Sequence, residues 1–322
     1  MHTEQSEQAQ PEKFNLVASV PFVLVHLLCG LAFVTGVHWQ WVLLAVATYV
    51  VRMFGVTAGY HRYFSHRAFS TNRVFQFALA FLAQLSAQKG VLWWAAHHRH
   101  HHRSSDQADD IHSPVQRGFW YSHVGWILST RWEATNQSAI RDFARYPELR
   151  WLDRWWLVPP LTGGVLLFAV GGLPWLVWGG FISTVALWHG TFVINSLTHV
   201  FGTRRYLTRD TSRNSLVLAL ITLGEGWHNN HHFHQNTANQ GWFWWEIDLT
   251  FYALKVLSLF GVVRDLRLPS EQTKLAFTRY TAEQRAQLQQ ESRFGMYQPK
   301  PPVPTPEGTP MLSGFTPVMI KR

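Results

Sequence analysis

Four long apolar runs constrain this chain more than any other feature of its sequence. They occupy residues 16–37, 39–59, 157–172 and 174–200. Each run approaches the roughly 20 apolar residues that a helix needs to cross the core of a bilayer. Short turns, Val37-His38 and Gly171-Gly172-Leu173, join the members of each pair, so each pair predicts a helical hairpin. We therefore expect an all-α integral membrane protein with four transmembrane helices, in preference to a soluble protein with four buried core helices.

The polar parts of the chain predict its organisation around these hairpins. Neither turn carries Lys or Arg, whereas the N-terminus, the central stretch and the C-terminal third are charged. The positive-inside tendency places these charged parts, both termini included, in the cytoplasm. We expect a polar segment at residues 1–14, a membrane domain with a helical cytoplasmic cap at residues 15–270, and a C-terminal helix with a Pro-rich tail at residues 271–322. Within the cap, residues 72–94 are predicted to form one interfacial helix.

Charge and cysteine content limit the possible partners and cofactors. The net charge of +9 suits anionic lipid headgroups, phosphate-bearing substrates or acidic electron carriers. Nucleic-acid binding is not expected, because no recognised motif accompanies the charge. Cys29 is the only cysteine, so neither a disulfide nor a cysteine-ligated iron–sulfur or zinc site is possible within the chain.

Histidines are concentrated where the apolar runs give way to polar chain. Imidazole is the commonest protein ligand for metals, so this density predicts a metal centre beside the membrane. The short clusters that contain these histidines are His61-Arg62-Tyr63-Phe64-Ser65-His66, His98-Arg99-His100-His101-His102, Asn195-Ser196-Leu197-Thr198-His199 and His228-Asn229-Asn230-His231-His232.

Spacing within the clusters predicts how the rings are presented. Positions i, i+3 and i+4 share one face of a helix, so His98, His101 and His102 can face one cavity, as can the three histidines that begin at His228. His61 and His66 are five apart, which suits the frayed end of a span better than joint ligation from the middle of a helix. The nine ligands are too many for one ion and about right for two.

Chemistry alone leaves the metal open, because imidazole binds zinc, copper, nickel and iron alike. The clusters contain no Glu-X-X-His pair of the kind found in carboxylate-bridged diiron bundles. Zinc hydrolysis needs only one ion and an adjacent glutamate base. Histidines outside the ligand set are expected to be packed residues (His26, His38, His189), residues off the ligand face (His97, His100), or groups near the site or on the surface (His112, His123, His234).

At these clusters the sequence resembles the membrane-bound fatty acid desaturases, in particular the Δ9-type acyl-CoA and acyl-lipid branch. The likeness runs from about residue 15 to 270 and includes three histidine boxes in the same order. The stretches that carry it are residues 57–66, His98 to His102 with Ser105-Asp106 and residues 109–112, residues 118–126, Asn195 to His199, and Gly224-Glu225-Gly226-Trp227 followed by His228 to His232.

The resemblance implies a four-span fold whose cytoplasmic cap holds a non-haem diiron centre. It further implies O₂ as co-substrate, two electrons from an external donor, and a cis double bond in an acyl chain as the product. Asn195 would hold a metal-bound water, and the nine clustered histidines would bind two iron ions: His61, His66, His98, His101, His102, His199, His228, His231 and His232.

The chain departs from the family pattern in two ways. Ile111 stands where relatives usually have a proline, so the turn that carries His112 is expected to differ in shape. No fused cytochrome b5 motif is present, so the donor is expected to be a separate protein of the ferredoxin, flavodoxin or cytochrome b5 type.

Spacing in the second apolar run suggests how the length of the acyl chain is measured. Tyr49, Met53 and Thr57 precede His61 by twelve, eight and four residues and so stack on nearly one helix face, where they could line a substrate tunnel. Ordinary helix packing explains the same spacing.

The reaction and the acyl carrier stay open at this stage. The same centre would serve a hydroxylase or an acetylene-forming enzyme, and the clusters could also belong to a membrane metal-binding or transport protein. The acyl group could arrive on coenzyme A, on a carrier protein or within a phospholipid.

Overall fold

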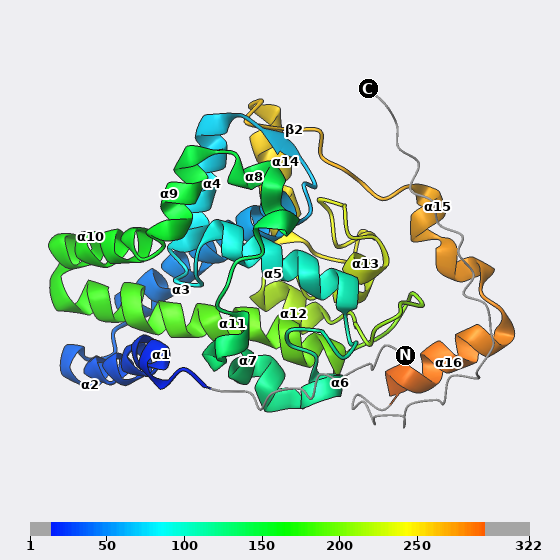
Figure 1. Cartoon of the computed structure of the whole chain (residues 1–322), viewed down its shortest axis with the longest axis horizontal. Helices are drawn as coiled ribbons and strands as arrows, with labels where there is room; N and C mark the ends of the chain where they lie inside the picture. The colour runs from blue at the N-terminus through cyan, green and yellow to red at the C-terminus, as the bar shows by residue number, and fades with distance from the viewer. Residues whose placement is uncertain (1–13, 294–322) are drawn as a thin grey trace, which may run out of the picture.

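The computed structural model describes residues 14–293, and these residues are mainly helical (Figure 1). The N-terminal segment before Phe14 and the predicted Pro-rich tail lie outside the described residues. In the described part of the chain, strands are limited to β1 (Ser70–Thr71) and β2 (Val263–Arg264), which pair antiparallel with Ser70 opposite Arg264.

The first predicted hairpin is present as two helical segments. The first is an almost continuous helix built from α1 (Leu16–Leu28), η1 (Cys29–Leu31) and α2 (Ala32–Thr35). It ends at Gly36, whose positive φ of 72° reverses the chain, and α3 (Trp39–Phe54) follows. The second helix extends beyond residue 59, the predicted end of its apolar span. It continues as the π-helix η2 (Gly55–Ser65), so the cluster from His61 to His66 lies at the end of the same continuous helix.

The second predicted hairpin lies within one long apolar stretch that Gly172 breaks. Gly172 has φ 63° and ψ −155°, which are not helical values, and it breaks α10 (Val158–Trp175) near its C-terminal end. The second arm begins after this break and continues through η6 (Leu176–Ile182), α11 (Ser183–Ser196) and η7 (Leu197–His199). A Cβ added at Gly179 would lie 3.1 Å from the side chain of Leu167, so the two arms pack closely. Figure 1 shows them lying side by side and joined at the end far from the cap.

Among residues 14–293, two helical stretches are long and apolar enough to cross a membrane, the second of them including the break at Gly172. They comprise Trp39–Ser65, with mean hydropathy 1.7, and Val158–His199, with mean hydropathy 1.9. Only 11% of the most apolar stretch of the second helix is buried, which distinguishes it from the core helix of a soluble protein. Large apolar side chains such as Phe33, Leu161 and Val165 are exposed along both hairpins, and a continuous surface of this kind needs lipid or protein to cover it.

We call the helical part that follows the first hairpin, together with residues 200–293, the cap. It begins with two helices, α4 and α5, where one was predicted. Residues 72–94 contain the end of α4 (Arg73–Gln84), a bend and the start of α5 (Val91–Ser104). Ala87 and Lys89 have positive φ in the bend, and Asp153 accepts hydrogen bonds from the backbone N–H groups of Leu92 and Trp93 at the start of α5. The distant carboxylate thus fixes a new helix start that the local pattern did not indicate.

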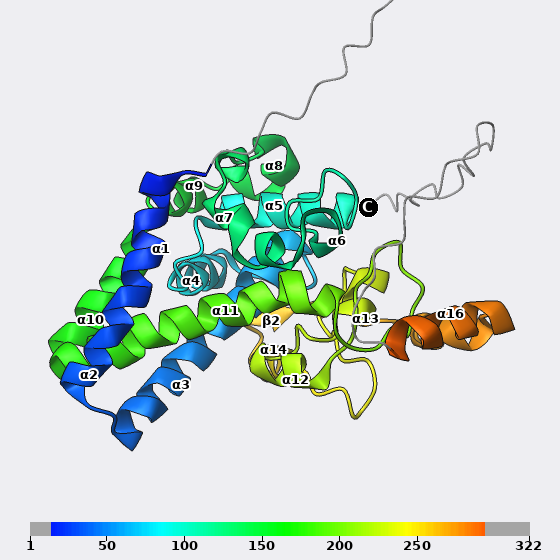
Figure 2. The same ribbon diagram turned by 90° about the horizontal axis from the view of Figure 1, so that it is seen from below.

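The remaining elements complete the cap around α5 and η2. A buried apolar cluster, including Tyr60, Phe64 and Leu92, joins these two helices. In chain order the other helical elements are α6 (Pro114–Arg117), η3 (Tyr121–Gly125), α7 (Trp126–Leu128), η4 (Thr130–Trp132), η5 (Gln137–Ile140), α8 (Arg141–Ala144), α9 (Pro147–Arg154), α12 (Leu216–Ile221), α13 (His228–Phe233), α14 (Leu249–Leu259), α15 (Glu271–Lys274), η8 (Ala276–Arg279) and α16 (Ala282–Arg293). Figure 2 shows α16 at the opposite end of the molecule from the hairpin turns.

Candidate metal centre

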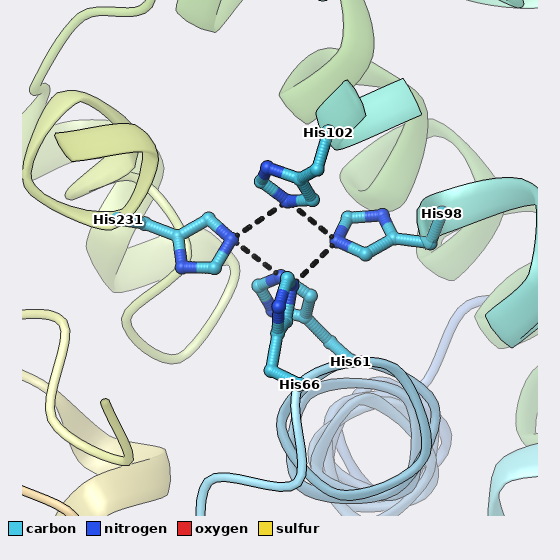
Figure 3. Close-up of side chains that lie close together, drawn as sticks. All are labelled: His61, His66, His98, His102 and His231. Carbon is cyan, nitrogen blue, oxygen red and sulfur yellow. Dashed lines mark hydrogen bonds between the residues drawn. The ribbon is translucent and has the colours of Figure 1, made fainter. Parts of the chain in front are cut away.

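The nine clustered histidines form two groups inside the cap. Within each group, the ligating nitrogen atoms lie within 4.8 Å of one another. Figure 3 shows the rings of the first group pointing toward a common centre. The first group contains His61, His66, His98, His102 and His231, and the second contains His101, His199, His228 and His232.

Neighbouring histidines in the sequence face different groups. His101 and His102 are consecutive in α5, yet His102 joins the first group and His101 the second. His231 and His232 are divided in the same way in α13. Successive side chains on a helix point about 100° apart, so each helix serves both groups. The predicted three-ring face is therefore shared, with the i, i+4 pair in one group and the i+3 ring in the other.

A π-helix explains how His61 and His66 reach the same group. The backbone N–H of His66 donates to the carbonyl of His61 at 3.2 Å, which is the i→i+5 bond of a π-helix. Five residues therefore complete about one turn, and both rings leave the helix on one side. The prediction that this spacing suits a frayed helix end better than ligation from within a helix assumed α-helical geometry, and the π-helix removes that restriction.

Carboxylates orient four of the rings. His61 contacts Glu225 through Nδ1, and His101 Nδ1 lies 2.8 Å from Asp110 Oδ1. His199 Nδ1 lies 3.3 Å from Asp106 Oδ2, and His232 Nδ1 lies 2.6 Å from Asp210 Oδ2. Each contact holds the Nδ1 proton and turns Nε2 toward the group. Metal-bound histidines usually donate their second N–H to a carboxylate or carbonyl, and this rule is the signal by which these acids could have been found from the sequence.

Glu225 and Asp248 form a buried ionic cluster with Arg62. Arg62 Nη2 lies 2.9 Å from Glu225 Oε1, and Arg62 Nη1 lies 3.0 Å from Asp248 Oδ1. Burial favours the neutral acid, but the neighbouring His61 and Arg62 outweigh it and lower the pKa of Glu225 to about 2. The anionic Glu225 is thus held against His61 by an arginine that is almost fully buried.

The electrostatics of the rings suit a cation. Burial, and then the neighbouring imidazoles, place the pKa of His66, His98, His102, His228 and His231 well below the usual value for histidine. Neutral imidazole is the form that binds a metal. The buried Nε2 atoms of His101 and His232 have no hydrogen-bond partner among the described residues.

The spacing of the nitrogens also fits metal coordination. In the first group, the Nε2 atoms of His66, His98, His102 and His231 form a chain with neighbouring atoms 2.9 Å apart, and His61 Nε2 lies 3.0 Å from that of His231. Adjacent ligands of one ion with metal–nitrogen bonds of about 2.1 Å lie about 3.0 Å apart. The first group therefore fits one ion, and the 3.2 Å between His228 Nε2 and His199 Nε2 fits one ion in the second group as well.

Asn195 lies in the last turn of α11, four residues before His199 and so on nearly the same face. Its backbone carbonyl accepts a hydrogen bond of 2.8 Å from Ser122 Oγ. The side chain is half-buried and does not belong to either histidine group. Its expected link to the site through a water stays a prediction.

The three residues of the expected tunnel face the interior. Met53 and Thr57 are buried, and Thr57 Oγ1 lies 2.7 Å from Thr250 Oγ1. Tyr49 donates to the carbonyl of Ile221 at 2.7 Å. A Cβ added at Gly190 of α11 would lie 2.6 Å from the Tyr49 hydroxyl and 3.1 Å from Met53 Cε, so these side chains fill the space that this glycine leaves.

Among the other histidines, His112 lies closest to the centre. It forms a third potential metal-binding set with His101 and Asp110, and its Nδ1 is buried without a hydrogen-bond partner among the described residues. His26, His189 and His123 form a separate hydrogen-bonded chain with links of 3.2 and 3.0 Å.

Comparison with known proteins identifies the class of this histidine-rich helical protein. The family model for fatty acid desaturases matches residues 37–283, which is most of the chain. The chain belongs to the fatty acid desaturase family. It is therefore an oxidoreductase of lipid metabolism, and the predicted resemblance is confirmed.

Relatives of this desaturase differ in the substrates that their names give. An sn-1 stearoyl-lipid 9-desaturase of Synechocystis is 38% identical over 78% of this chain and 79% of its own length. A Delta-9 desaturase-like 5 protein of Arabidopsis thaliana is 36% identical over 82% of this chain and 90% of its own. An acyl-CoA 5-desaturase of Anemone leveillei is 35% identical over 77% of this chain and 78% of its own.

Proposed function

We propose that this desaturase introduces a cis double bond, at the Δ9 position, into a saturated acyl chain carried by a lipid or by coenzyme A. The observation that carries the proposal is the pair of buried histidine groups beside two long apolar helices. Relatives named as 9-desaturases support the position, and relatives named for acyl-lipid and acyl-CoA substrates support both carriers.

The proposed cofactor is a pair of iron ions, with five histidines for one and four for the other. When bound, these ions supply the redox chemistry that an unactivated methylene requires, since its hydrogens are not acidic enough for an ordinary base. The second group has four histidines where the first has five. We assign the place of the missing fifth ligand to a water held by Asn195. Electrons are expected from a separate ferredoxin, flavodoxin or cytochrome b5 type of donor.

The proposed topology has four spans in two hairpins, with the cap and termini on the cytoplasmic side. Exposed apolar side chains along both hairpins support this arrangement, as do the reversals at Gly36 and Gly172. The proposed domain limits are residues 15–270 for the membrane domain and residues 271–322 for the C-terminal part.

The acyl chain is proposed to run from the metal groups toward Tyr49 and Met53. These side chains lie against Gly190, which supports a floor at the contact of α3 with α11. Thr57 lies one turn nearer the metals along η2.

Expression of the chain in a desaturase-deficient host tests the reaction. Fatty acids are analysed by gas chromatography with localisation of double bonds, for the unmodified chain and for His231→Ala. We expect new Δ9 cis-monoenes that disappear in the variant. Hydroxylated acyl chains would assign the centre to a different outcome of the same chemistry. An unchanged profile from folded, iron-loaded protein supplied with electrons would reject an acyl substrate.

A further inference from the structure

Residues 203–214 form a loop that holds two of the three carboxylates that orient the second histidine group, Asp106 and Asp210. Asp210 lies in the loop and accepts from His232 Nδ1 at 2.6 Å. Thr211 donates to Asp106 Oδ2 from its backbone N–H and from its hydroxyl, both at 2.7 Å, and the same oxygen lies 3.3 Å from His199 Nδ1. Among the described residues, the histidines that contact Asp106 and Asp210 are His199 and His232, and both belong to the second group. We call residues 203–214 the bracket loop.

Arg204 anchors the bracket loop from within. Its Nη2 donates to the carbonyl of Asp210 at 2.8 Å and to the carbonyl of Thr208 at 3.2 Å. Its Nη1 forms an ion pair with Glu291 of α16. The Arg204 side chain is 6% exposed and that of Glu291 is 25% exposed, so the pair is largely shielded from water.

Other contacts hold the same loop against the C-terminal arm, which comprises residues 271–293 with α15, η8 and α16. Ser292 Oγ accepts from the backbone N–H of Arg204 at 3.1 Å, and the carbonyl of Glu291 accepts from Arg213 Nη1 at 2.5 Å. The Tyr280 hydroxyl accepts from the N–H of Leu207 at 3.1 Å. The arm thus supports the loop on its outer side, while the loop supports the carboxylates on its inner side.

We propose that Arg204 is a positioning residue for one metal position only. Through its ion pair with Glu291 it fixes the Asp210 segment, and thereby His232 and the second group. The carboxylate of the first group is supported separately, because His61 contacts Glu225, which Arg62 holds. The loop also accepts hydrogen bonds from the backbone of α13, which carries His231, but it does so through Asn214 and not through Arg204 or Asp210. This inference rests on the proposed function, since it assumes that both groups hold an ion.

Release of iron from the full-length protein tests the proposal. The protein is purified in detergent and loaded with ferrous iron, and an excess of a chelator that absorbs light on binding iron is added. Glu291→Gln keeps the shape of the side chain and removes its charge. Glu148→Gln is the control, because the Glu148 side chain is 23% exposed, close to the 25% of Glu291, and it also forms an ion pair with an arginine, Arg73, in a contact between α9 and α4.

We expect two phases of release in the unmodified protein. Glu291→Gln accelerates one phase about fivefold, as expected for loss of an ion pair whose glutamate is 25% exposed, and leaves the other phase unchanged. Hydrogen–deuterium exchange becomes faster in residues 203–214, and Glu148→Gln changes neither property. Equal acceleration of both phases, a single phase in the unmodified protein, or no difference between the variants would overturn the proposal.

A second variant separates positioning from simple undocking of the arm. Arg204→Lys retains a positive charge for Glu291 but loses the planar fork that also reaches Asp210. We expect the same single phase to accelerate while amide exchange in α16 stays unchanged. If Arg204→Lys released iron like the unmodified protein, Arg204 would not act through Asp210. The proposed function is judged separately, by the acyl products of the unmodified chain.

Discussion

At the scale of single residues, the carboxylate behind a histidine decides how firmly its ring faces the metal. Asp210→Asn should weaken binding at one metal position by about tenfold, because the charge that holds the Nδ1 proton of His232 is lost. The iron content after equilibrium dialysis against a chelator measures the effect. Asp109→Asn is the control, since Asp109 is 61% exposed and contacts His100, which belongs to neither group. Equal losses in both variants would contradict a specific role for Asp210.

Arg62 offers a second test at this scale. Arg62→Ala leaves Glu225 and Asp248 buried without their cation, so the free energy of unfolding should fall by about 3–5 kcal/mol. The control, Arg73→Ala, breaks a partly exposed ion pair and should cost about 1 kcal/mol or less. Denaturant titration of the purified protein in detergent measures both. Similar values for the two variants would show that the buried cluster adds little.

At this scale, sequence reasoning selected the nine histidines that the structure gathers into two groups. The nine clustered histidines could be selected because dense imidazole is rarely needed except for metals. Their division into two groups could not be predicted, since it depends on the angle at which α5 and α13 approach η2. The supporting acids were missed because carboxylates are common and their partners can lie far away in the sequence, as His199 does from Asp106.

At the scale of elements, composition predicted the hairpins well but not where each helix ends. The second apolar helix continues as η2 through the polar histidine box, because burial in the cap replaces the lipid contacts of the span. The bend between α4 and α5 depends on Asp153, a residue more than sixty positions away, so local sequence could not reveal it.

The contact between α3 and α11 leads to a test of the tunnel floor. Met53→Ala should shift the products toward longer acyl chains, because it removes the side chain that lies against Gly190. Gas chromatography of products from a mixture of saturated substrates measures the shift. Val50→Ala is the control, since Val50 is 41% exposed on the outer side of α3. An unchanged profile in Met53→Ala would assign Met53 to ordinary helix packing.

At the scale of the whole molecule, the histidine centre links stability to pH. The pKa of His66, His98, His102, His228 and His231 is lowered by burial and by neighbouring rings. In the unfolded chain the same residues titrate near pH 6.5, so below that pH the unfolded state binds more protons than the folded state. Stability of the metal-free protein should therefore fall as the pH drops below about 6.5, by up to about 1.4 kcal/mol per pH unit for each histidine.

Thermal unfolding of the metal-free protein in detergent, between about pH 8 and pH 5, measures this dependence. The depressed pKa of Asp210 and Glu225 contributes a loss of stability only below about pH 4.5, outside this window. A midpoint temperature that stays constant down to pH 5 would contradict the prediction.

The single cysteine makes the arrangement of the spans testable. In a Cys29→Ala background, Val37→Cys at the first hairpin turn should react with an impermeant maleimide only from the outer face of the membrane. Ser138→Cys in the cap should react only from the cytoplasmic face. Both positions are exposed, so the protein itself does not block either reagent. Labelling of both from the same face would reject the proposed topology.

The alternation of His101 with His102, and of His231 with His232, has a geometric consequence for the whole centre. In each pair, one peptide bond joins a histidine of the first group to a histidine of the second. The separation of the two metal positions is therefore measured twice by covalent structure, once in α5 and once in α13. A sliding movement of either helix would displace rings of both groups together. The backbone itself therefore keeps the distance between the two groups constant.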